Sequence, residues 1–168
     1  MRRLACLVTL LCALTLSAYG QATTVYLLRH AEKTEATMIR DVPLSEAGLA
    51  RADAVARLLA SAKVTAIHST QYQRTQQTAA PLAAAYGLGV QPYDPSALDA
   101  FAEALRTSAG IHVVVGHSNT TPYLAAALGG AEVPPIPEDE YDRLYHIVLL
   151  DGEPVQTTLL RIPAGQPK

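Results

Sequence analysis

The chain has 168 residues, with 13 Lys and Arg against 15 Asp and Glu, so its formal net charge is −2 at pH 7. This weakly acidic balance argues against a nucleic-acid partner, because proteins of that class carry a clear excess of cations. It also means that a site for an anion would have to be local, built from a few placed cations.

The N-terminal segment is typical of a secretory signal peptide. Arg2 and Arg3 precede an apolar run from Leu4 to Leu16, and small residues follow up to Ala22. That run is about 13 residues long, short of the roughly 20 that a membrane-spanning helix needs. We therefore expect residues 1–22 to be removed and residues 23–168 to form an exported domain, periplasmic or secreted, with no stable membrane insertion after cleavage.

Removal of this segment changes what the rest of the chain can do. Both cysteines, Cys6 and Cys12, lie in it, so the mature chain has no thiol for a disulfide or for a thiolate metal site. The loss of Arg2 and Arg3 leaves 11 basic against 15 acidic residues, a formal net charge of −4. The remaining length, about 146 residues, is enough for one domain with a sizeable core.

Apolar strand patterns alternate with helical patterns along this domain. The predicted strands are residues 24–29, 64–69, 111–117, 144–151 and 155–162.

Helices are predicted between most of these strands. The first follows Ser45, a good N-cap, and its apolar residues recur at helical spacing: Leu49, Ala52, Val55, Ala56 and Leu59. Further helices are predicted over about residues 72–86, 96–108 and 120–128.

This alternation predicts an α/β fold, a three-layer sandwich with a mostly parallel central sheet and helices on both faces. The last two strands, joined by a short turn at Asp151 and Gly152, should form an antiparallel C-terminal edge. The stretch "EVPPIPEDE", residues 132–140, is a Pro-rich acidic loop and resembles a linker.

Polar residues follow three of the predicted strands. Arg29 and His30 end the first, Arg74 comes shortly after the second, and His117 follows the third. In a parallel sheet ligands bind outside the carboxyl ends of the strands, so we expect these side chains to meet. Two cations and two imidazoles around one point predict an oxyanion pocket with a candidate nucleophile.

Three motifs carry a family resemblance. The segments "LRHAEK", "STQYQRTQQTA" and "GHSNTTPYLAAALGG" resemble, in order and spacing, the motifs of the histidine phosphatase superfamily, the phosphoglycerate mutase-like proteins. The resemblance covers about residues 24–151. It implies a phosphomonoester or phosphoprotein phosphatase of the histidine acid phosphatase type, acting on a phosphorylated small molecule, protein or lipid. Together with the predicted signal peptide, this gives an exported phosphatase.

The resemblance also implies roles for the site residues. His30 would attack phosphorus and form a phosphohistidine that water hydrolyses, with His117 as the second catalytic imidazole. Arg29, Arg74 and Ser118 would bind the phosphoryl oxygens. Two fixed guanidiniums supply the charge that a metal would otherwise supply, so no metal and no other cofactor is expected.

The general acid for the leaving group stays open. Four carboxylates are candidates: Glu32, Asp94, Asp99 and Glu103. The three remaining histidines stand within apolar strands and are interpreted as structural: His68, His112 and His146.

Two alternatives also stay open. The sequence Gly116-His117-Ser118-Asn119-Thr120 resembles the nucleophile elbow G-x-S-x-G, with threonine in place of the last glycine, so Ser118 could serve a serine hydrolase. Neither Arg29-His30 nor Arg74 has a role in that reading. The other alternative is a non-catalytic phosphate-binding module on a degenerate phosphatase scaffold.

Overall fold

The computed structural model describes residues 20–35, 41–129 and 131–163. Most of the predicted signal peptide lies outside these residues, and its proposed end, Ala22, is the first residue of the first strand.

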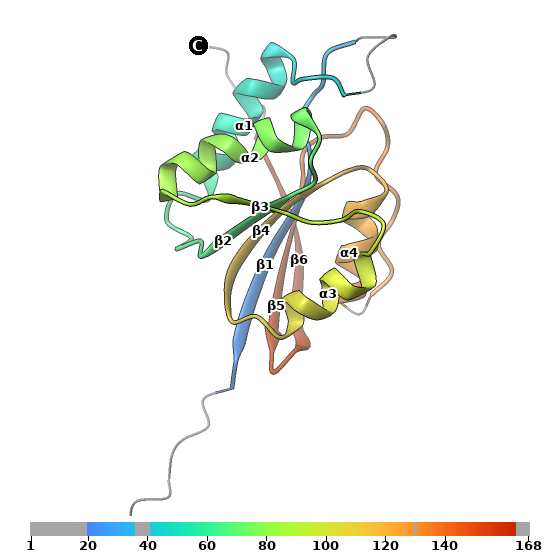
Figure 1. Ribbon diagram of the computed structural model, residues 1–168. Helices are drawn as coiled ribbons and strands as arrows, with labels where there is room; N and C mark the ends of the chain where they lie inside the picture. Colours follow the sequence, from blue (N-terminus) through green and yellow to red (C-terminus); the bar gives the residue numbers. More distant parts are fainter. Residues whose placement is uncertain (1–19, 36–40, 130, 164–168) are drawn as a thin grey trace, which may run out of the picture.

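In the described part of the chain, one mixed sheet forms the centre of the molecule (Figure 1). Its strands are β1 Ala22–Arg29, β2 Ala66–Ser69, β3 Val90–Pro92, β4 Gly110–Gly116, β5 Arg143–Leu150 and β6 Glu153–Arg161. The spatial order is β3-β2-β4-β1-β5-β6. The first four of these are parallel, whereas β5 and β6 are antiparallel to their neighbours.

Helices cover both faces of the sheet, so the predicted three-layer α/β fold is confirmed. They are α1 Glu46–Leu58, α2 Gln73–Tyr86, α3 Leu98–Arg106 and α4 Thr120–Gly129. Figure 1 shows α1 and α2 together on one face and α3 and α4 on the other. None of the helices in these ranges is long and apolar enough to cross a bilayer.

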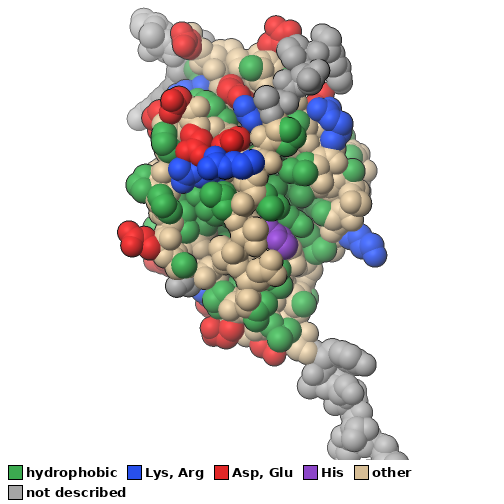
Figure 2. Space-filling model, turned by 180° about the vertical axis from the view of Figure 1, so that it is seen from behind, with side chains coloured by type: hydrophobic (Ala, Val, Ile, Leu, Met, Phe, Trp, Pro, Cys, Tyr) green, Lys and Arg blue, Asp and Glu red, His purple; other side chains and the backbone are tan. Residues whose placement is uncertain are grey.

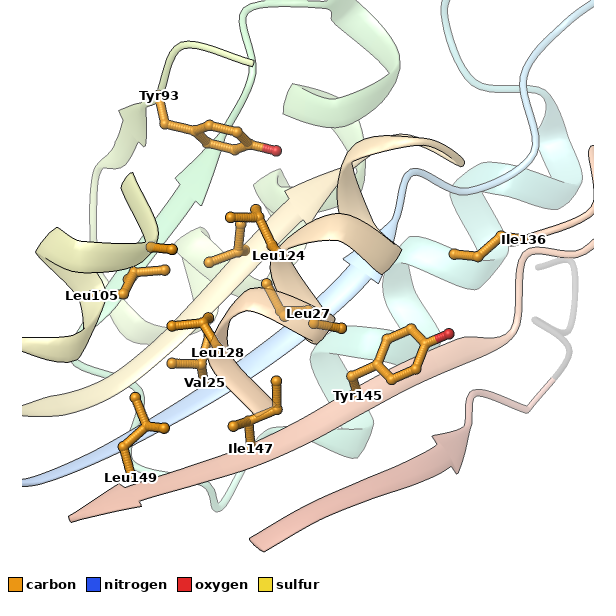
Figure 3. Packing of buried hydrophobic residues seen from close by; sticks show 13 residues of the cluster. Val25, Leu27, Tyr93, Leu105, Leu124, Leu128, Ile136, Tyr145, Ile147 and Leu149 are labelled. Atoms are coloured by element: carbon orange, nitrogen blue, oxygen red, sulfur yellow. The ribbon is translucent and has the colours of Figure 1, made fainter. Parts of the chain in front are cut away.

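Side chains of β1 pack alternately into two separate hydrophobic cores, one on each face of the sheet. Val25 and Leu27 point to the face of α3 and α4, where they pack with Leu124, Leu128 and other buried residues (Figure 3). Leu28 points to the opposite face and packs with residues of α1 and α2. This is the period of two that a strand buried on both faces requires.

All five predicted strands begin and end within two residues of the observed ones, and the antiparallel pair β5 and β6 is present. Its turn is tight because Asp151 and Gly152 both have positive φ, 53° and 83°, as a two-residue hairpin turn requires. The sequence pattern did not predict β3, which has three residues and ends at Pro92. A proline, having no N–H to donate, is tolerated there because β3 is an edge strand.

The helix α1 begins where it was predicted, but the prediction that Leu49 belongs to its buried apolar face is wrong. Ser45 is the N-cap and accepts a hydrogen bond from the Gly48 N–H, yet Leu49 is 51% exposed. The buried stripe runs instead through Gly48, Ala52 and Val55, and at 3.6 residues per turn Leu49 lies roughly 100° away from it. A Cβ at position 48 would come within 2.0 Å of the Glu32 carbonyl oxygen, so glycine lets α1 pack onto that backbone.

Candidate active site

The ends of β1 and β4 place two histidines side by side. His30 follows β1 and His117 follows β4, and these strands are parallel neighbours. The backbone N–H of His30 donates to the Gly116 carbonyl at 2.9 Å, which extends the pairing past the end of the strands. The two imidazole rings meet edge to face with centroids 5.5 Å apart.

Arg74 reaches the same point from the first turn of α2. Its Nη2 lies 3.5 Å from Nδ1 of His117, and its guanidinium lies over the Tyr72 ring at 4.4 Å from the centroid. The same tyrosine meets the His117 ring edge to face at 5.1 Å. The structure therefore brings His30, His117 and Arg74 together, as the strand-end argument predicts.

The hydrogen bonding of His30 determines its tautomer. Its Nδ1 lies 2.8 Å from the Ala31 carbonyl oxygen, and because a carbonyl only accepts, Nδ1 carries the proton. Burial lowers the pKa of His30 to about 3, and the charges of Arg29 and Arg74 act in the same direction. The ring is therefore neutral near pH 7, with the lone pair on Nε2.

His117 is also neutral and is held by a threonine. Burial, and then the charge of Arg74, lower its pKa to about 4. Arginine only donates, so Nδ1 is the side of the ring that accepts, and Nε2 donates to Thr70 Oγ1 at 3.0 Å. Thr70 is fully buried and its hydroxyl also contacts that of Thr75. An imidazole fixed in this way can take up a proton when an anion binds beside Nδ1.

Arg29, predicted to bind phosphoryl oxygens, is buried and held by a loop. It is 2% exposed, and its Nη1 donates to the carbonyl oxygens of Pro137, Glu138 and Glu140 at 2.8–3.1 Å. Its guanidinium also lies over the Tyr141 ring, 4.3 Å from the centroid. The Pro-rich acidic loop therefore holds this cation in place.

Ser118 binds a carboxylate and not an imidazole. Its hydroxyl donates to Glu138 Oε1 at 2.8 Å, while the neighbouring ring of His117 directs its Nε2 to Thr70. A serine nucleophile needs a base that takes its proton, and histidine is the usual one. This geometry gives the serine hydrolase reading no support.

The hydrogen bonds of three of the four candidate general acids are with groups other than the two histidines: Glu32 bonds to Arg51, Asp94 to Ser96 and Asp99 to Tyr123. Burial alone would raise the pKa of Glu32, but hydrogen bonds from Arg51 at 2.6–2.9 Å outweigh this and the pKa is lowered. Asp99 accepts from the Tyr123 hydroxyl, and Glu103 lines a different cavity beside Arg106.

Asp94 is the one of the four that lines a cavity next to the site. It accepts hydrogen bonds from the side chain and backbone of Ser96, which lower its pKa. The cavity has a volume of about 620 Å³. Its lining is formed by Asp41, Gln71, Tyr72, Pro92, Tyr93, Asp94 and Pro95.

This cavity adjoins the histidines through Tyr72, which contacts His117 and Arg74. Asp41 stands at its rim, with Oδ1 at 3.9 Å from Arg74 Nη1. Within the described residues, no group of three or more His, Cys, Asp or Glu is arranged to hold a metal ion.

Sequence reasoning missed several contributors to this site. Thr70 and Tyr72 lie inside the second quoted motif, two to four residues before Arg74, where their position just after a strand was a usable signal. Glu138 and Tyr141 lie in and just after the loop interpreted as linker-like. The density of acidic residues in that loop was the available sign of a partner cation.

The three remaining histidines lie elsewhere. His68 and His112 pair with each other across β2 and β4, with 3.1 Å between ring nitrogens. His146 stacks on Tyr26 at 4.8 Å between ring centroids. These contacts agree with a structural role.

Basic side chains form no continuous patch on the face of the described residues that Figure 2 shows, where several of them lie directly beside acidic ones. This pattern suits a site whose positive charge is local and enclosed.

The chain matches one family model. The family model described as the histidine phosphatase superfamily (branch 1) matches residues 25–104, so the resemblance inferred from the motifs is confirmed. No curated protein matches the chain.

Solved structures match over most of the chain. The protein histidine phosphatase SixA, in a complex with tungstate, is 20% identical, with a TM-score of 0.66 over 82% of this chain and 94% of that one. A mycobacterial glucosyl-3-phosphoglycerate phosphatase is 19% identical, with a TM-score of 0.60 over 86% and 100%. Phosphoglycerate mutase from Bacillus anthracis str. Sterne is 14% identical, with a TM-score of 0.63 over 86% and 94%. At these identities the likeness shows the fold alone.

Proposed function

We propose that this chain, similar to the histidine phosphatase superfamily, is an exported phosphomonoesterase that works through a phosphohistidine on His30 without a metal ion. The observation that carries the proposal is the neutral imidazole of His30, whose Nδ1 is fixed by Ala31, beside His117 and Arg74. A neutral ring with its lone pair on Nε2 is a competent nucleophile.

The reaction proceeds in two displacements. Nε2 of His30 attacks phosphorus, the P–N bond forms as the P–O bond to the leaving group breaks, and the leaving oxygen takes a proton from solvent water. Water then attacks the phosphohistidine, releases phosphate and restores the neutral imidazole. Arg74 and a proton acquired by His117 stabilise the charge on the equatorial oxygens, which is the main contribution a protein makes to phosphoryl transfer.

The cavity beside Tyr72 is the proposed site of the leaving group. Its walls include two tyrosines and two prolines, which suit a flat or apolar group. Two carboxylates, Asp41 and Asp94, also line it, and none of its lining residues in the described part of the chain is a cation. A leaving group with its own carboxylate, such as a phosphoglycerate, would be repelled there, so hydrolysis of a neutral or cationic ester is favoured over a phosphoglycerate mutase reaction.

The test is turnover of a panel of phosphoesters by the purified mature domain. We expect hydrolysis of p-nitrophenyl phosphate and of neutral or cationic esters, with 3-phosphoglycerate turned over more slowly. Activity should persist in EDTA and fall with vanadate, which imitates five-coordinate phosphorus. Activity lost in EDTA and restored by a divalent ion would overturn the metal-free mechanism. Phosphate binding without turnover of any ester would favour the binding module.

The export proposal has a separate test. The basic, apolar and small-residue pattern before Thr23 supports cleavage. Mass spectrometry of protein from the periplasm or medium of a bacterial host should find a mature N-terminus at Thr23, or at Gln21 if cleavage follows Gly20. Full-length protein retained in the membrane fraction would contradict the proposal.

A further inference from the structure

We propose that Glu138 is an internal competitor for the phosphate site, an inference that rests on the proposed phosphatase site. In the structure, its carboxylate binds two groups expected to bind phosphoryl oxygens, the guanidinium of Arg29 and the hydroxyl of Ser118. A phosphoryl group that reaches both of these donors has to displace the carboxylate.

The contacts of Glu138 are those of a bridging anion. Oε2 accepts from Arg29 Nη2 at 2.8 Å, and Oε1 accepts from Ser118 Oγ at 2.8 Å. A carboxylate thus presents two oxygens to two donors, as one edge of a phosphate would. The two donors come from the ends of neighbouring strands, β1 and β4, that also carry His30 and His117.

Glu138 can move away while Arg29 stays fixed. The Glu138 side chain is 76% exposed, against 2% for Arg29. Arg29 is held through Nη1 by three backbone carbonyls and by the Tyr141 ring, so displacement of the carboxylate frees Nη2 without moving the guanidinium. Water screens this ion pair on the exposed Glu138 side, which limits how much the pair stabilises. A phosphate dianion would form stronger charge-assisted hydrogen bonds with the same donors.

The alternative role for a carboxylate here is that of the missing general acid. A general acid has to carry a proton at the working pH. The Ser118 hydroxyl and the Arg29 guanidinium instead lower the pKa of Glu138, which favours the ionised form. The contacts therefore favour a competing anion over a proton donor, and the two roles predict opposite effects of a neutral substitution.

The experiment compares Glu138→Gln with wild type and with Asp139→Asn. Asp139 is the next residue of the same loop and is exposed. Its substitution removes one negative charge from the loop but leaves the contact between Arg29 and Glu138 in place. Calorimetry with inorganic phosphate measures Kd, and steady-state kinetics measure KM and kcat. Calorimetry does not depend on turnover, so it still tests the inference if the proposed reaction fails.

We expect Glu138→Gln to lower the Kd for phosphate and the KM for p-nitrophenyl phosphate by about three- to tenfold, the scale of one exposed charge interaction. Asp139→Asn should change both by less than about twofold, and Glu138→Ala should act in the same direction as Glu138→Gln. Unchanged or weaker phosphate binding in both Glu138 variants would overturn the inference. A kcat loss that is larger for alkyl phosphates than for p-nitrophenyl phosphate would also overturn it and make Glu138 the general acid.

Discussion

Replacing His30 with alanine should abolish the phosphoenzyme and lower turnover of a phosphoester by roughly five orders of magnitude, the scale seen when an enzyme loses its nucleophile. No other imidazole can take over the attack. His117 directs Nε2 to Thr70 and Nδ1 to Arg74, so neither of its nitrogens presents a free lone pair to phosphorus. Any residual rate would come from stabilisation of charge by Arg74 and His117.

The measurement is rapid quenching with a labile 32P-phosphoester. Wild-type protein should retain label that is lost in acid and kept in alkali, as a phosphoramidate bond requires, and His30→Ala should retain none. His146→Ala is the matched control: His146 lies in β5 and stacks on Tyr26 of β1, so its substitution should leave labelling intact. Labelling of the His30 variant equal to wild type would assign the nucleophile elsewhere, and fluorophosphonate labelling at Ser118 would revive the serine hydrolase.

The fold was largely predictable because its central strands are continuous apolar runs. A strand covered on both faces has few polar positions, as in β4, where His112 and the four residues that follow it are buried. The edge strand β3 lacked that signal, since Val90 is only partly buried and the next two residues are exposed. The exposure of Leu49 was not predictable from apolar spacing alone, because the stripe on α1 is set by the close approach of Gly48 to the Glu32 backbone.

The meeting of His30, His117 and Arg74 was predictable for a different reason. Each follows a strand of a parallel array, and the topology of such a sheet brings those ends to one edge. The partners of Arg29 depend instead on the path of a loop more than 100 residues away in sequence. No local pattern specifies which cation an acidic loop will contact, so Glu138 became visible only in the structure.

Arg74→Ala should lower kcat by about two to three orders of magnitude, the cost of losing one preorganised donor to a developing oxyanion. The effect should fall on kcat and kcat/KM together, because the guanidinium binds phosphoryl oxygens most strongly in the transition state. Folding should change little, since the structural contacts of Arg74 are a stacking interaction with Tyr72 and a 3.9 Å ion pair with Asp41. Such contacts contribute about 1–2 kcal/mol each.

Three comparisons separate a role in catalysis from a role in the scaffold. Arg74→Lys should recover only part of kcat, because an ammonium lacks the planar pair of donors of a guanidinium. Arg57→Ala, at the exposed end of α1, removes one arginine far from the site and should leave kinetics unchanged. In NMR titrations the pKa of His117 should rise in Arg74→Ala, because the cation that disfavours its protonated form is gone. A variant with wild-type kcat and a raised His117 pKa would show that Arg74 lies beside the histidine without contributing to phosphoryl transfer.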